Sequence, residues 1–158
     1  MQTDTTLDAI DRRILQALQA QGRMSYDELA AGISLSPSAT LRRVKRLEDS
    51  GVIAGYTALV VPERVGLGLT AYISVRLAKA GDARSPIDTF AAAVQAWPEV
   101  VECAALTGEM DYLLRVLVRD MAHYSGFIMD SLLKHPAVQD CKTSFMLRRL
   151  KGTTTVPL

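Results

Sequence analysis

Four cationic side chains stand within five positions of this chain: Arg42, Arg43, Lys45 and Arg46. A guanidinium group can donate two parallel hydrogen bonds to the O6 and N7 atoms of guanine, and both guanidinium and ammonium groups neutralise phosphates. We therefore expect Arg42 or Arg46 to reach guanine edges, and Arg43 and Lys45 to contact the phosphates of double-stranded DNA. The alternative is an ordinary solvated charged face, which is the usual explanation of a single basic run.

The residues that open this basic run are small or polar and would let the backbone approach a groove closely. Pro37 after Ser36 is typical of a helix start, because a first-turn N–H has no partner within the helix and proline lacks that N–H. Leu41, Val44 and Leu47 recur on the other side of the helix, and we expect them to be buried. The predicted DNA-binding residues are Ser36, Ser38, Ala39, Thr40, Arg42, Arg43, Lys45 and Arg46.

Two shorter helices are predicted before the basic one. Asp8 can cap the first, and Ser25 with Glu28 makes a Ser-x-x-Glu capping box for the second. The predicted turn before the basic helix spans residues 32–36, and Gly51 is well placed to end that helix. Three short helices with this turn form a helix-turn-helix pattern, which places its last helix in the DNA major groove.

Downstream of these helices the sequence becomes rich in predicted strands. Residues 52–61 are expected to form a short hairpin or wing. From residue 69 the order is β-α-β-β-α-β, the ferredoxin-like split βαβ unit. The predicted strands are 69–78, 100–106, 111–118 and 138–150, and the predicted helices begin at 85 and 120. The fold class is therefore α+β: a winged helix-turn-helix domain at 1–62, a linker at 63–68 and a ferredoxin-like domain at 69–158.

Composition sets a few further expectations. The chain has 158 residues, is 49% hydrophobic and carries a net charge of +1. No apolar run is long enough to span a membrane, so we expect a cytoplasmic protein with no membrane partner. The small net charge is compatible with DNA binding because the positive charge is concentrated on one helix and a dimer would present two such helices.

The cysteines and histidines show no pattern of a reactive or metal-binding site. Cys103 and Cys141 are expected to be buried. His123 and His135 are expected to be structural, with no metal or cofactor bound.

Several local motifs follow one another in a specific order along almost the whole chain. They are Leu7-Asp8…Asp11-Arg12, Gly22-Arg23, Glu28-Leu29-Ala30, Leu35-Ser36-Pro37-Ser38, Arg43-Val44-Lys45-Arg46-Leu47-Glu48, Gly51-Val52-Ile53, Gly55-Tyr56 and Thr107-Gly108…Asp111-Tyr112-Leu113-Leu114. Together they resemble the feast/famine regulators, the Lrp/AsnC family. The resemblance implies a transcription regulator that responds to an amino acid. Its second domain, called RAM in this family, would pair into homodimers that assemble further, commonly to octamers, with the effector bound between dimers near residues 108–112.

The turn at Gly108 has the chemistry to bind the zwitterionic end of an amino acid. Glycine permits a positive φ that leaves backbone N–H groups open to a carboxylate, and Asp111 could hold the α-ammonium. Leu106, Met110 and two further methionines could line an apolar pocket, which favours leucine or methionine as effector. The family's effector-side strand adds Thr143 and Ser144, of which strand alternation directs only one toward a ligand. The predicted effector-binding residues are Leu106, Thr107, Gly108, Glu109, Met110, Asp111, Tyr112, Met121, Thr143, Ser144 and Met146.

Other interpretations remain open at this point. Residues 108–111 could form only a hairpin turn in which Asp111 bonds its own backbone, with the methionines in the core. Sirohaem decarboxylases resemble the fold of this family, but that chemistry needs several basic or histidine groups around a large cavity, and the chain has two scattered histidines. We therefore expect no enzyme activity. A broad architectural DNA-binding protein is the third alternative, since an octamer could wrap DNA.

Overall fold

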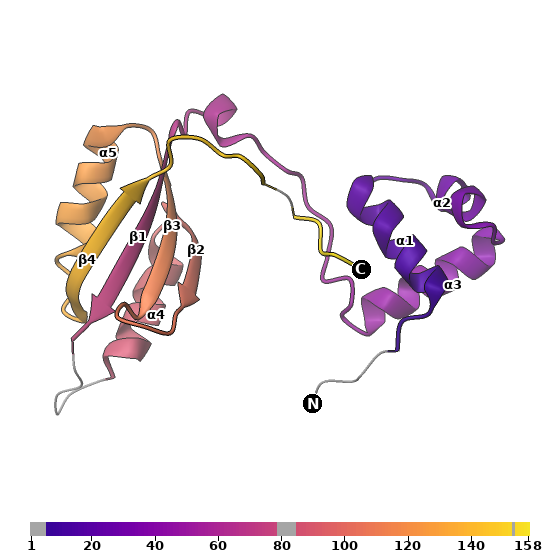
Figure 1. Ribbon diagram of the computed structural model, residues 1–158, viewed down its shortest axis with the longest axis horizontal. Helices are drawn as coiled ribbons and strands as arrows, with labels where there is room; N and C mark the ends of the chain where they lie inside the picture. Colours follow the sequence, from indigo (N-terminus) through magenta and orange to yellow (C-terminus); the bar gives the residue numbers. More distant parts are fainter. Residues whose placement is uncertain (1–5, 79–84, 153) are drawn as a thin grey trace. The chain divides into compact units, whose positions relative to one another are not determined.

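The computed structural model describes residues 6–78, 85–152 and 154–158, and these divide into two compact units (Figure 1). Unit 1 contains the chain up to Leu59 together with Lys151–Leu158, and unit 2 contains Val60–Leu150. The division differs from the predicted domains at the end of the chain, because residues 151–158 group with the N-terminal unit. No helix in the described part of the chain is long and apolar enough to cross a membrane.

Unit 1 contains three helices, α1 (Ala9–Ala20), α2 (Tyr26–Ile33) and α3 (Pro37–Asp49). Asp8 and Ser25 each form a reciprocal capping box, with Asp11 and Glu28 respectively. The three predicted helix starts are therefore confirmed, because at the third start Ser36 Oγ accepts from the N–H of Ala39 at 3.3 Å.

The turn between α2 and α3 is shifted from the predicted position. Gly32 is the penultimate residue of α2, and the left-handed residue that ends this helix is Ser34, with φ 61°. Serine tolerates this conformation less well than glycine, but here the N–H of Ser34 donates to the carbonyl of Ala30 and closes the helix.

The buried side of α3 also differs from the predicted one. Leu41 is 47% exposed, whereas Thr40 is fully buried beside Val44 and Leu47. Burial of Thr40 leaves no polar atom unpaired, because its Oγ1 donates to the carbonyl of Ser36 at 3.0 Å. The core of unit 1 consists of Ile14, Leu15, Leu29, Ile33, Val44 and Leu47.

The chain leaves α3 through a left-handed glycine. Gly51 has φ +74° and donates to the carbonyl of Glu48, which confirms the predicted helix end. Residues 52–61, expected to form a short hairpin or wing, contain no strand in this fully described segment, and residues 54–61 run without regular structure to a short 3₁₀ helix, η1 (Pro62–Val65).

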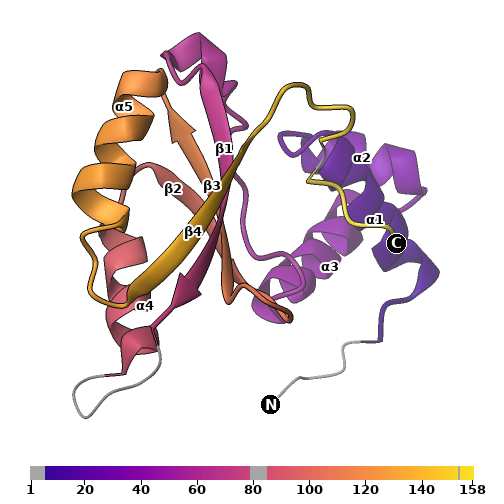
Figure 2. The same cartoon turned by 60° about the vertical axis from the view of Figure 1, so that its left-hand side comes forward.

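Unit 2 is a four-stranded antiparallel sheet with two helices on one face, as Figure 2 shows. The strands are β1 (Leu69–Leu77), β2 (Val100–Ala105), β3 (Tyr112–Val118) and β4 (Val138–Phe145), in the order β2-β3-β1-β4. The helices are α4 (Pro86–Ala96) and α5 (Met121–Gly126), and α5 continues as a π-helical segment, η2 (Phe127–Leu132). The β-α-β-β-α-β order is confirmed, but the last strand ends at Phe145 rather than at Leu150.

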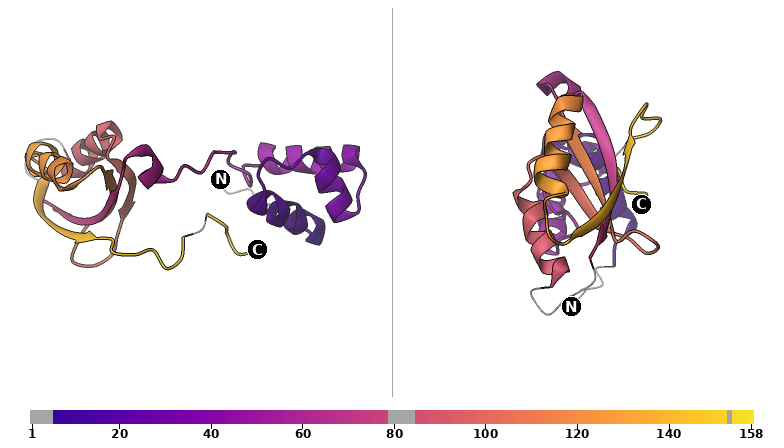
Figure 3. Two further views of the ribbon diagram at one scale, coloured as in Figure 1. Left: turned by 90° about the horizontal axis from the view of Figure 1, so that it is seen from above. Right: turned by 90° about the vertical axis from the view of Figure 1, so that its left-hand side faces the viewer.

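The two faces of this sheet have different surroundings. Ile73, Val75, Leu114 and Val116 are fully buried against the helices, where they pack with Phe90. No helix of the described part of unit 2 covers the other face (Figure 3). That face carries half-buried or exposed side chains from three neighbouring strands: Tyr72, Ser74, Arg76, Leu113, Arg115, Lys142 and Ser144.

The two cysteines are less buried than predicted. Cys103 is exposed on β2, which is an edge strand, and Cys141 is half buried on β4. An edge strand packs against one neighbour only, which explains why the apolar context of Cys103 did not lead to burial. Partial burial raises the pKa of both thiols, which disfavours the reactive thiolate.

Candidate nucleic-acid interface and effector site

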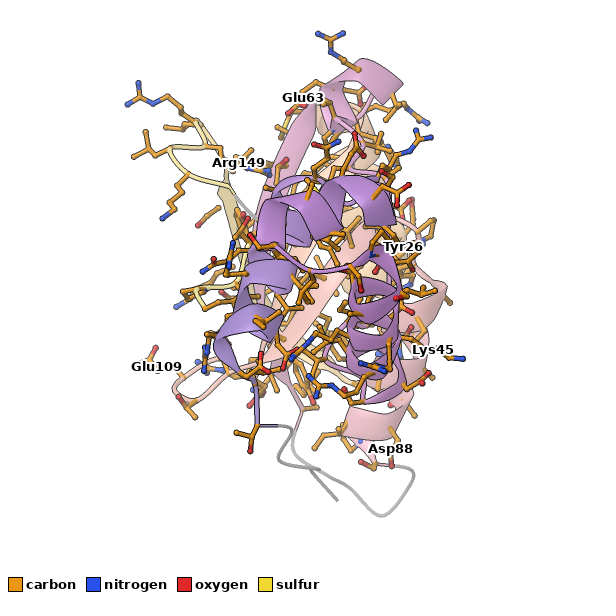
Figure 4. The ribbon with its side chains drawn as sticks, turned by 90° about the vertical axis from the view of Figure 1, so that its right-hand side faces the viewer. Tyr26, Lys45, Glu63, Asp88, Glu109 and Arg149 are labelled. Atoms are coloured by element: carbon orange, nitrogen blue, oxygen red, sulfur yellow. The ribbon has the colours of Figure 1, made fainter. Side chains whose placement is uncertain are left out.

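The solvent-facing side of α3 carries a compact set of side chains suited to a DNA groove. Ser38, Leu41, Arg42 and Lys45 are exposed there, three or four positions apart, so they share one helix face. The side chain of Lys45 points away from the helix into solvent (Figure 4). Thr40, which the sequence predicts to face the groove, is excluded from this face by its complete burial.

Arg43 and Arg46 have partners within unit 1 that the sequence did not reveal. Arg43 Nη1 lies 2.7 Å from Asp8 Oδ2 and 2.9 Å from Asp11 Oδ1, and Arg46 Nη2 lies 2.5 Å from Asp11 Oδ2. Asp11 is fully buried at the N-terminus of α1. The two arginines therefore link α3 to α1 through ion pairs with the shared carboxylate of Asp11. Arg46 remains half exposed and can still reach outward, whereas Arg43 is three-quarters covered.

The protonation behaviour of this ion-pair cluster matches its geometry. The backbone N–H of Asp11, and then the guanidinium of Arg43, lower the pKa of the Asp8 carboxyl to about 2. The same carboxylates raise the pKa of Arg43, hydrogen bonding to Asp8 being the largest cause. Asp8 and Arg43 therefore stay ionised as a pair near neutral pH. A phosphate contact by Arg43, as predicted from sequence, would compete with two carboxylates that already hold it.

A concave surface lies beside these side chains. It encloses about 520 Å³ and is lined by four cations and one carboxylate: Arg42, Arg43, Lys45, Arg46 and Asp49. Such a basic hollow on the last helix of a helix-turn-helix unit matches the electrostatic footprint of a DNA-binding surface.

In unit 2, the predicted turn has the backbone conformation that the sequence suggested. Gly108 has φ +123°, and a side chain added there would meet open space. Asp111, however, is engaged in the fold: its Oδ2 accepts from the N–H of Leu77 at 2.7 Å, and its own N–H donates to Val75 at 2.9 Å. The Asp111 carboxylate therefore holds the turn against β1. At most its other oxygen, Oδ1, is available to an ammonium group.

An arginine that the sequence analysis did not single out lies against this turn. Arg76 Nε donates to the carbonyl of Glu109 at 3.1 Å, and its Nη2 lies 3.8 Å from the sulfur of Met110. Its guanidinium would suit a carboxylate better than backbone N–H groups alone, because it carries a full charge. The only sequence signal was its place in a strand where apolar residues alternate with the uncharged polar residues Thr70, Tyr72 and Ser74.

The predicted effector-binding residues do not come together within one chain. Leu106 to Asp111 lie at the end of the sheet where β1 finishes, next to Val75 and Leu77. Met146 donates its N–H to Thr70, and Met121 follows the end of β3, so both lie at the opposite end. Six residues of β1 separate the two ends, roughly 20 Å. Leu106 and Met121 are also about half exposed.

Three further predicted residues divide between the two faces of the sheet. Tyr112 packs its ring 5.2 Å from that of Phe90, and Thr143 Oγ1 accepts from Tyr124 at 2.7 Å, so both face the helices. Ser144 is exposed opposite Tyr72 on the uncovered face. Thr143 and Ser144 therefore lie on opposite faces of the sheet, and which of the two contacts a ligand stays a prediction.

Comparison with known proteins decides the family. Residues 7–54 match the winged helix-turn-helix DNA-binding family model, and residues 70–156 match that of the Lrp/AsnC ligand binding domain. The chain belongs to the Lrp/AsnC family. It is 40% identical to the leucine-responsive regulatory protein of Haemophilus influenzae over 96% of this chain and 90% of that one. It is 37% identical to the transcriptional regulator AzlB of Bacillus subtilis over 96% of both chains.

Solved structures agree with this membership of the Lrp/AsnC family. A transcriptional regulator from Neisseria meningitidis, crystallised as a complex with L-Met, superimposes with a TM-score of 0.92 at 50% identity, covering 96% of this chain and 97% of that one. An AsnC family regulator from Agrobacterium tumefaciens gives 0.88 at 34% identity, covering 96% and 97%. The chain is therefore a DNA-binding transcription regulator with an amino-acid-binding domain.

Membership of the Lrp/AsnC family also decides against the decarboxylase alternative, because the relatives are transcription regulators and not enzymes. The two histidines have structural contacts. His123 Nε2 lies 3.1 Å from Glu99 Oε1, and His135 Nδ1 accepts from the N–H of Ala137. Within the described residues, no group of three or more His, Cys, Asp or Glu side chains could hold a metal ion.

Proposed function

We propose that this Lrp/AsnC regulator responds to an apolar amino acid of the leucine or methionine type, bound between dimers of a homo-oligomer in the cytoplasm. The observation that carries the proposal is the similarity, at 50% identity over 96% of the chain, to a Neisseria meningitidis regulator crystallised with L-Met. Sequence-specific DNA binding by α3 would be the output, and effector binding would act by shifting the assembly that presents several α3 helices together.

The placement of the candidate residues supports a site shared by several chains. Leu106 and Met110 lie at one end of the sheet and Met121 and Met146 at the other, so only residues from different copies could surround one small ligand. The uncovered face of the sheet supplies a surface on which a second copy could pair, and an octamer would bring such pairs together. Near Gly108, the Arg76 guanidinium would hold the effector carboxylate.

Calorimetric titration of the full chain with a panel of amino acids tests the effector class. We expect leucine or methionine to bind on the order of tenfold or more tightly than asparagine or lysine, because an apolar lining rejects polar side chains that lose their hydration. Arg76→Ala should weaken binding on the order of tenfold by removing one charged hydrogen-bonding partner. Lys134→Ala removes an exposed cation that follows η2 and forms an ion pair with Asp130, and it should leave binding unchanged. Binding of charged or amide amino acids alone would contradict the proposal.

A second test uses Leu41 and concerns sequence-specific contacts between α3 and DNA bases. It lies exposed between the cations of α3, where an apolar side chain can contact the methyl group of thymine. We expect wild-type protein to bind a selected DNA site about fourfold more weakly when thymine is replaced by uracil, as loss of one buried methyl group implies. Leu41→Ala should abolish that difference, and Leu147→Ala, at a leucine that is 99% exposed, should retain it. Equal affinity for all DNA sequences would instead favour the broad architectural role.

A further inference from the structure

The last residues of the chain form one wall of an apolar groove on unit 1. The groove encloses about 810 Å³ and is walled by the end of α1, by residues 52–59 and by the C-terminal segment itself. Its apolar walls include Leu15, Leu18 and Ile53, which also belong to or pack against the core of unit 1. The groove is therefore a continuation of the helix-turn-helix core that the three helices leave uncovered.

The C-terminal segment lines this groove with the alternation of an extended strand, and its residues Val156 and Leu158 remain 61% and 38% exposed. Thr154, Val156 and Leu158 line the groove, and these are every second residue. The segment is uncharged from Gly152 onward, although Arg148, Arg149 and Lys151 stand immediately before it. Pro157 further favours an extended conformation at Val156, because a residue that precedes proline is biased away from the helical region.

One side chain of α1 binds the backbone of this segment in the manner of a neighbouring strand. Gln19 Nε2 donates to the carbonyl of Val156 at 3.2 Å, and Gln19 Oε1 accepts from the N–H of Val156 at 2.5 Å. A primary amide reproduces the donor and acceptor pair of a peptide unit, so Gln19 satisfies both backbone groups of one residue. Extended peptides are bound in this way when main-chain hydrogen bonds give affinity and alternate side chains enter apolar pockets.

We propose that this groove is a binding site for the chain's own C-terminal segment, residues 154–158, and that Gln19 is the residue that recognises it. The segment continues from β4, and the linker of residues 60–68 leads into β1. These two strands pair so that Phe145, the end of β4, lies opposite Ala71, near the start of β1. Both connections therefore leave the sheet at the same end, and the C-terminal segment lines the same groove of unit 1 as residues 52–59, which precede the linker. The docked segment is a second, non-covalent tether of the helix-turn-helix unit to the ligand-binding domain.

Hydrogen exchange of the full-length protein tests this binding site without reference to any effector or DNA. Peptic fragments that contain Val156 should exchange on the order of tenfold more slowly than an unstructured chain, because opening must break the two hydrogen bonds between Gln19 and Val156. Gln19→Ala should remove that protection. Gln19→Glu keeps an acceptor for the N–H of Val156 but loses the donor to its carbonyl and sets a carboxylate against it, so this variant should lower the protection.

The matched control is Gln16→Ala, an exposed glutamine one turn earlier on the same helix. This variant should retain the full protection, and fragments from α2 should exchange alike in all four proteins, which shows that unit 1 stays folded. Exchange of Val156 at the unprotected rate in the wild-type protein would overturn the proposal. Equal protection in the wild-type protein and in both Gln19 variants would overturn the role of Gln19 and with it the assigned site.

Discussion

Replacing Asp11 with alanine is expected to destabilise unit 1 by about 3 kcal/mol, since it removes a buried, charge-assisted network at a helix start. Asp11 is fully buried, accepts from the N–H of Asp8 and binds both Arg43 and Arg46. Its loss would release α3 from α1 and so disturb the placement of the outward side chains Arg42 and Lys45. We expect faster hydrogen exchange in fragments of α1 and α3, together with weaker DNA binding.

The control for this variant is Asp27→Ala. Asp27 is also an acidic residue in a first helical turn, that of α2, but it is exposed. Its replacement should change the free energy of unfolding by less than about 1 kcal/mol, the range of helix-dipole effects at exposed sites. Similar exchange rates in the Asp11 and Asp27 variants would contradict the assigned role of Asp11. Fragments of β1 and β3 should be unaffected in either variant, because those strands belong to the other unit.

The helix starts could be predicted from sequence because their chemistry is local. The side chains of Asp8, Ser25 and Ser36 each accept a hydrogen bond from the backbone N–H three residues onward. Each interaction therefore involves only four consecutive residues. The ion pairs of Arg43 could not be predicted in this way. Its partners lie 35 and 32 positions earlier, and a basic run looks the same whether its cations face solvent or a carboxylate on another helix.

The burial of Thr40 in the position predicted for Leu41 has a different physical cause. Both the series 40, 44, 47 and the series 41, 44, 47 fit the 3.6-residue period of a helix, so hydrophobicity alone favoured the leucine. The hydrogen bond from Thr40 Oγ1 to the carbonyl of Ser36 offsets the free-energy cost of burying the hydroxyl. Leu41 then lies on the solvent-exposed side of α3. The same bond explains why a residue predicted to touch DNA is in the core, while one predicted to be core lies on the exposed face.

The turn of the proposed effector site could be predicted from sequence, but the side chains around that turn could not. A positive φ at Gly108 follows from residue type, and the hairpin follows from the two flanking strands. The contact between Arg76 and the turn depends on how β1 pairs with β3, which no short motif encodes. The distance between Met110 and Met146 along the sheet likewise depends on strand register. The proposed site, which would draw on several copies of the chain, could not be derived from the periodicity of one copy.

Replacing Arg42 and Arg43 individually should distinguish a residue that contacts DNA bases from one that stabilises the fold of unit 1. Arg42 is exposed on the outward face of α3, and no ion pair involving it occurs among the described residues. Arg42→Ala should lower affinity for a site selected from random DNA about 10- to 100-fold, the value of one good bidentate contact to guanine, and relax sequence preference at one position. Its free energy of unfolding should stay close to that of the wild type.

Arg43→Ala should give the opposite pattern, because its guanidinium is held by Asp8 and Asp11. We expect faster hydrogen exchange in α1 and α3, whereas the slope of log affinity against log salt concentration should remain as in the wild type, since no phosphate contact is lost. Lys45→Ala, by contrast, should reduce that slope by about 1. Arg64→Ala, in η1 outside the helix-turn-helix unit, controls for loss of positive charge alone. A lowered salt slope with unchanged exchange in Arg43→Ala would show that this arginine binds phosphate after all, as its sequence position first suggested.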